Sequence, residues 1–163
     1  MNSFINQEVH PGTNYVTIPE FVETLKTGST LNKTTPFQAA QKINNYSDEA
    51  LSFTKELKAG NNKELHYILN DIKSMVYLGK YYTHKIKGST YFEMLKKFDN
   101  DKKENREAAV KELSTASFFW KKYMNISLES YKNPIWTNRV GIVDWEKIYN
   151  WTLKDIKIVK ESN

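Results

Sequence analysis

Apolar side chains recur every three or four residues along most of the chain between residues 35 and 157, and this spacing is the strongest constraint on its fold. Such a repeat matches the turn of an α-helix and places the apolar side chains on one face. Sustained alternation of apolar and polar residues, the pattern of a half-buried strand, does not occur in this region. The sequence therefore predicts an all-α protein.

The first long helix has a start signal and a stop signal. Thr35 can cap its N-terminus, Pro36 suits the first helical position, and Gln38 can complete a capping box. Apolar residues then recur at helical spacing until Gly60, which is followed by two asparagines. The sequence predicts a helix from Thr35 to the residues just before Gly60.

Two further long helices follow. The second is predicted over about residues 63–87, with Gly88 as its terminating glycine, and a shorter turn or a continuation is expected at residues 91–95. The third is predicted over about residues 104–131. Pro134 ends it, because proline cannot continue a helix.

Each helix is expected to bury one apolar stripe. Gly79 interrupts the stripe of the second helix, and we expect it to let a Trp or Tyr side chain of a neighbouring helix approach closely. The side chains expected to face the core include Met75 and Tyr82 of the second helix, Trp120 and Leu128 of the third, and Trp151 of the last.

A shorter helix completes the chain, and a less regular arm precedes the first long helix. Asp144 can cap the last helix. Residues 1–34 are predicted to be irregular, with a brief strand-like alternation at residues 15–18 and about two helical turns at residues 19–26. Helices joined by short loops favour antiparallel packing. We therefore predict an antiparallel bundle of three long helices and a shorter C-terminal helix over residues 35–163.

The composition argues against several classes of function. Zero cysteine removes disulfides, thiolate zinc sites and cysteine nucleophiles. The net charge of +5 comes almost wholly from lysines that stand beside Asp and Glu, so we expect no nucleic-acid partner. No run approaches the roughly 20 apolar residues that span a bilayer, so we expect no membrane partner either. The first eight residues lack the basic and apolar runs of a signal peptide.

No signature of catalysis or metal binding is present. The histidines, His10, His66 and His84, lack the spacing used for zinc, and most acids lie on lysine-bearing helical faces, so we predict no metal, no cofactor and no catalytic residue in this chain. His84 and Tyr82 could line a cleft as ligand-binding residues. For His84 we favour a hydrogen-bonded structural role.

The aromatic residues of the last third are the remaining candidates. All four tryptophans lie between Trp120 and Trp151, and Trp136 and Arg139 lie in the loop before Asp144. An indole ring can stack on a sugar while a nearby Arg bonds its hydroxyls, so Trp136 and Arg139 are candidate ligand-binding residues. We favour a structural interpretation in which Trp136 clamps the loop onto the end of the bundle.

Four segments carry a resemblance to a known class of protein. They are residues 15–22 (YVTIPEFV), 35–40 (TPFQAA), 71–86 (DIKSMVYLGKYYTHKI), and 136–141 (WTNRVG) with Asp144 and Trp145. Together they resemble the helical C-terminal region of large Bacteroidetes-type carbohydrate-active proteins. The resemblance implies an upstream glycoside hydrolase domain on which this region packs, catalytic acids outside this chain, and a periplasmic or secreted parent.

These observations lead to one main hypothesis and two alternatives. The main hypothesis is a non-catalytic helical module of a glycan-processing protein, which stabilises the catalytic domain of the same parent chain or shapes its substrate cleft, with an oligosaccharide as a further candidate ligand. The first alternative is a free-standing helical domain that binds a protein partner through its aromatic C-terminal face. The second is a self-contained helical enzyme that uses His84 and neighbouring tyrosines.

Overall fold

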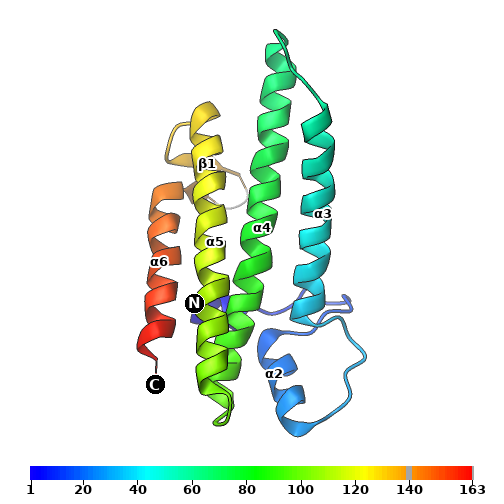
Figure 1. Cartoon of the computed structure of the whole chain (residues 1–163), viewed down its shortest axis with the longest axis vertical. Coiled ribbons are helices and arrows are strands. Elements are labelled where there is room, and N and C mark those ends of the chain that lie inside the picture. The colour runs from blue at the N-terminus through cyan, green and yellow to red at the C-terminus, as the bar shows by residue number, and fades with distance from the viewer. Residues whose placement is uncertain (139–140, 163) are drawn as a thin grey trace.

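The computed structural model describes residues 1–138 and 141–162 and confirms an all-α fold. Three long helices and a shorter C-terminal helix form the bundle, and a small hairpin lies between the last two of them (Figure 1). The elements are α1 (Asn2–Ile5), α2 (Ile18–Thr27), α3 (Pro36–Glu56), α4 (Lys63–Lys97), α5 (Lys102–Ser130), β1 (Ile135–Thr137), β2 (Gly141–Val143) and α6 (Trp145–Glu161).

The helix starts that the sequence predicts are confirmed in the structure. The Thr35 hydroxyl accepts a hydrogen bond from the Gln38 backbone, and the Gln38 side chain accepts one from the Thr35 backbone, so the capping box is complete. The Asp144 carboxylate accepts from the Lys147 backbone at 3.0 Å and caps α6 in the same way. These local signals fix where α3 and α6 begin.

The prediction that the second helix ends at Gly88 is wrong, because α4 continues to Lys97. Gly88 is buried inside the helix, where an added Cβ would lie 2.7 Å from Leu113 Cγ of α5, so this glycine permits close packing of two helices. Gly79 has a similar role, although it faces Ser47 and Ile43 of α3 rather than a Trp or Tyr side chain.

Two hydrophobic clusters fill the bundle at different heights along α4. The lower cluster joins the end of α4 and the start of α5 to residues of the N-terminal arm, among them Ile5, Val16 and Val22. The arm, which includes the short helices α1 and α2, therefore packs on the bundle itself. The upper cluster surrounds Trp120 and Trp145, and the Trp120 Nε1 donates to the Trp145 carbonyl at 3.0 Å.

Four of the side chains named above as facing the core are exposed instead. They are Met75 and Tyr82 on α4, Leu128 on α5 and Trp151 on α6. Each lies on a helix at a height or an angle where no neighbouring helix covers it, which periodicity along one helix cannot reveal. The loop after α5 also differs from the expectation, since β1 and β2 pair as an antiparallel hairpin with Trp136 opposite Ile142.

We expect Trp120→Ala to lower the free energy of unfolding by about 3–5 kcal/mol, because it deletes a large buried aromatic side chain. Only 5% of Trp120 is exposed, and its ring packs on Tyr81 with 4.9 Å between centroids. Denaturant unfolding measures the loss. Trp136→Ala is the matched control, since 69% of that tryptophan is exposed; equal losses in the two variants would contradict the assignment of the core.

Candidate functional site

The structure does not bring the predicted site residues together. Tyr82 and His84 both lie on α4, but two residues along a helix rotate by about 200°, so they face opposite sides of it. Trp136 lies on β1, on a different element from both. Arg139 lies outside the described residues.

His84 has the structural environment that we favour from the sequence. Its Nδ1 lies 2.6 Å from Glu112 Oε2 of α5, and its ring stacks on Phe119 with the planes 9° apart. Burial alone would raise the pKa of Glu112, but the hydrogen bond from His84 and the charges of His84 and nearby lysines lower the pKa below its ordinary value. The pair therefore links α4 to α5.

Trp136 faces away from the bundle, so our interpretation of it as the residue that clamps the loop is wrong. Side chains alternate between the two faces of a strand, and here Ile135 and Val143 pack into the upper cluster. Their neighbours Trp136 and Ile142 form a cross-strand pair on the opposite face, 69% and 71% exposed. The hairpin thus presents an apolar pair to its surroundings.

The base of the hairpin is held by hydrogen bonds. The Asn133 amide nitrogen donates to Asp144 at 3.1 Å, and the Asn133 oxygen accepts from the Trp145 backbone at 2.9 Å. The same Asp144 carboxylate caps α6, so the hairpin and the helix share one anchor. Trp136 is therefore displayed from a fixed support.

A larger exposed apolar surface runs along α3 and α4, and the sequence analysis missed it. Successive residues of this surface lie seven positions apart along each helix, except that four positions separate Phe53 from Leu57. Residues at these spacings lie on the same face of a helix. All are exposed. This surface, called here the α3–α4 apolar face, consists of Tyr46 and Phe53 on α3, Leu57 directly after α3, and Ile68, Met75 and Tyr82 on α4.

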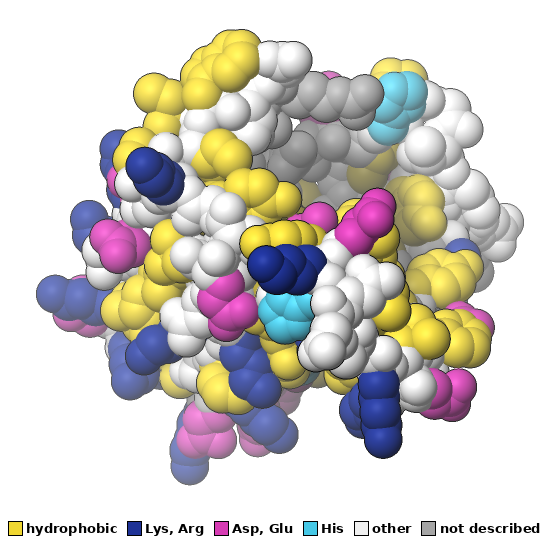
Figure 2. All heavy atoms as spheres, turned by 90° about the horizontal axis from the view of Figure 1, so that it is seen from above, with side chains coloured by type: hydrophobic (Ala, Val, Ile, Leu, Met, Phe, Trp, Pro, Cys, Tyr) yellow, Lys and Arg dark blue, Asp and Glu magenta, His cyan; other side chains and the backbone are white. Residues whose placement is uncertain are grey.

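The α3 residues and the α4 residues of this face lie on the same side of the helix pair. Lys80 of α4 bonds Asn44 and Asp48 of α3, so these three residues mark one edge of the contact between the helices. Met75 and Phe53 are rotated to the other edge of the same contact. Viewed from above, the molecule shows hydrophobic side chains at its surface, with basic and acidic side chains intermixed (Figure 2).

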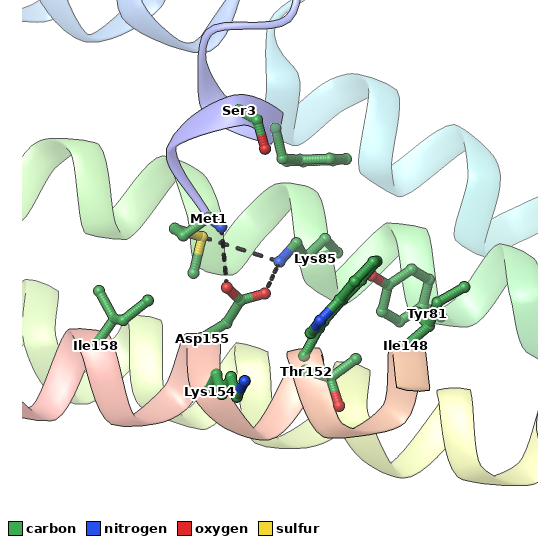
Figure 3. A pocket seen from close by; sticks show the side chains of 11 residues that line it. Met1, Ser3, Tyr81, Lys85, Ile148, Thr152, Lys154, Asp155 and Ile158 are labelled. Atoms are coloured by element: carbon green, nitrogen blue, oxygen red, sulfur yellow. Dashed lines mark hydrogen bonds and ion pairs between the residues drawn. The ribbon is translucent and has the colours of Figure 1, made fainter. Parts of the chain in front are cut away.

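A pocket of about 480 Å³ opens between α1, α4 and α6. Figure 3 shows Lys85 of α4 and Asp155 of α6 meeting within it as an ion pair, with the Met1 backbone nitrogen 3.0 Å from the other Asp155 oxygen. Tyr81 also lines the pocket. Sequence reasoning did not single out this pair, whose partners lie 70 residues apart in the chain.

The described residues contain neither a cluster of possible metal ligands nor a membrane-spanning helix. Within residues 1–138 and 141–162, no three His, Asp or Glu side chains gather as metal ligands would. In the same residues, no helix combines the length and the apolar character needed to cross a bilayer. No family model, curated protein or solved structure matches the chain.

We expect Glu112→Gln to lower the melting temperature at neutral pH and to lose this effect in acid. Because the pKa of Glu112 is lowered in the folded protein, its carboxylate stabilises the fold above the ordinary pKa of 4.5. That contribution disappears as the pH falls from 4.5 through the lower folded-state pKa. Thermal melts from pH 7 to pH 2 measure this.

The matched control is Glu107→Gln, at an exposed position on the same helix. Its melting temperature should stay close to that of the wild type across the series. A Glu112→Gln deficit that persists unchanged at the acid end would mean that the carboxylate charge does not stabilise the fold.

Proposed function

We propose that this chain is a non-catalytic helical module that docks onto a partner domain through the α3–α4 apolar face. The observation that carries this proposal is the exposure of large apolar side chains in register along two packed helices, with Met75 74% exposed. Scattered exposed apolar residues are ordinary on a protein surface, whereas contiguous ones are typical of interaction sites.

The geometry of this face favours a helical segment of the partner. The spacing of seven residues on α4 matches the a or d positions of a coiled coil, where side chains pack into a facing helix. An amphipathic helix lying against both α3 and α4 would cover Phe53, Met75 and Tyr82 together. Tyr82, a predicted ligand-binding residue, then contributes as part of this surface.

We propose that the partner is the catalytic domain of a glycan-processing protein, encoded in the same parent chain. The support for this partner is the resemblance of four segments of the sequence to the helical regions of such proteins. In that setting, the module would stabilise the catalytic domain or shape its substrate cleft. The catalytic acids would belong to the partner.

The exposed hairpin supports a second candidate function. Trp136 and Ile142 form an exposed apolar pair, through which a free-standing domain could bind a separate protein. The exposed indole ring of Trp136 could also stack on an oligosaccharide. This candidate uses a different surface from the first. Substitutions on the two surfaces therefore tell the two functions apart.

We expect Met75→Glu to weaken association with the partner domain at least tenfold, because it places a charge in an apolar contact. The experiment takes the domain encoded beside this chain in its reading frame and measures binding by titration calorimetry. Phe118→Glu on α5 is the matched control, since it adds the same charge at another exposed apolar position. The control should bind like the wild type.

Four results would count against the proposal. Unchanged binding of Met75→Glu would remove the α3–α4 apolar face as the docking surface. A reading frame with no further domain would remove the glycan-processing partner. Loss of partner binding in Trp136→Ala but not in Met75→Glu would move the function to the hairpin. A saturable change in tryptophan fluorescence on titration with an oligosaccharide, absent in Trp136→Ala, would do the same.

A further inference from the structure

The pocket between α1, α4 and α6 has apolar walls and a polar floor. Phe4 comes from α1, and Ile148, Trp151 and Ile158 come from α6. Its volume of about 480 Å³ lies in the range of about 300–1,000 Å³ that is usual for small-molecule sites. The pocket shares no residue with the α3–α4 apolar face, so a ligand bound in it would add a function to the proposed docking.

The polar floor is built from buried side chains. Lys85, Asp155 and Tyr81 are each more than nine-tenths buried. Lys85 and Asp155 are paired, and the second Asp155 oxygen accepts from the Met1 nitrogen. Each Asp155 oxygen therefore already has a donor, whereas Lys85 has further N–H groups. Besides Asp155, the described contacts of the Lys85 ammonium are the weakly accepting Met1 sulfur at 3.9 Å and the Phe4 ring, with 5.5 Å between Nζ and the ring centroid.

The Tyr81 hydroxyl is the group that points to a ligand. It lines the pocket, and none of the described hydrogen bonds involves it. Burial, and then the neighbouring Tyr82 and Asp155, raise the pKa of Tyr81, so the hydroxyl keeps its proton at neutral pH and can donate it. Figure 3 shows the Tyr81 hydroxyl directed to the side of the ring on which Lys85 lies.

The charges around the pocket favour an anion. Its lining contains two cationic side chains, Lys85 and Lys154, and one anionic side chain, Asp155. The floor offers unused donors, namely the remaining N–H groups of Lys85 and the Tyr81 hydroxyl, and the Tyr81 oxygen is its one unused acceptor among these groups. A ligand that matches this floor offers acceptor oxygens with a negative charge, and one that matches the walls has an apolar body.

We propose that this pocket binds small apolar carboxylates, with the carboxylate on Lys85 and Tyr81 and a ring or short alkyl body against Phe4, Ile148 and Trp151. The Lys85–Asp155 pair holds the lysine in place, since the carboxylate fixes its position from below. A carboxylate can accept hydrogen bonds from Lys85 and Tyr81 at once. Because it is charged, these bonds are stronger than those to a neutral ligand of the same shape.

The test is titration calorimetry of the full chain with 2-naphthoate. We expect binding, with the neutral 2-naphthamide at least tenfold weaker and 2-naphthylmethylamine, a cation of similar shape, weaker still. Tyr81→Phe removes one hydrogen bond and should weaken 2-naphthoate binding about fivefold. Trp151→Ala should weaken it as well, because it removes part of the apolar wall.

Matched controls lie beside each change. Tyr82→Phe alters a neighbouring tyrosine that does not line the pocket, and Trp136→Ala alters an exposed tryptophan on another element, so both should bind 2-naphthoate like the wild type. Thermal melts check that each variant is folded. Met75→Glu should also leave this binding unchanged, which keeps it distinct from docking.

Two sets of results would overturn the proposal. One is the absence of 2-naphthoate binding at millimolar concentration. The other is binding that the neutral amide or the amine matches, or that Tyr81→Phe leaves unaltered in a folded protein, since either would mean that the carboxylate does not meet the floor of this pocket.

Discussion

The length of α4 is the constraint on which the rest of the structure depends. It has 35 residues, against 21 in α3, 29 in α5 and 17 in α6, and at 1.5 Å per residue it extends for about 52 Å. Its lower part is enclosed by α5 and the N-terminal arm, and Gly88 packs closely against Leu113 of α5. Its upper part is packed on fewer sides, which leaves Ile68 and Met75 exposed. The lower part of α4 therefore contributes to the buried core, and its upper part contributes to the exposed apolar face.

Local sequence signals predicted where helices begin, but they did not predict which side chains other helices would cover. The capping box at Thr35 and the cap at Asp144 depend on residues three positions away, so sequence contains the whole interaction. Gly88 looks like a terminating glycine because its sequence context is the same in both roles, and only Leu113 of α5 reveals the difference. Met75 has helical spacing, but spacing cannot say where the covering helix is missing.

The site residues show the same division. Sequence reasoning identified His84 as a hydrogen-bonded residue. It also singled out Trp136, but its exposure follows from the alternation of side chains in the hairpin, and strands of three residues are too short to show that pattern in the sequence. It had no means of finding Lys85 and Asp155, since a buried ion pair between distant helices leaves no motif in either segment. A spacing of seven between Ile68, Met75 and Tyr82 was present in the sequence, and it predicts one shared face without saying whether that face is covered.

Hydrogen–deuterium exchange along α4 tests most directly the claim that one helix has an enclosed part and an open part. Local opening costs less free energy where fewer side chains are buried. In the isolated chain, the amides of residues 88–95 should exchange far more slowly than those of residues 66–76, by about a hundredfold or more on that basis. Equal protection along the whole of α4 would contradict the account, because it would mean that its upper part is as well enclosed as its lower part.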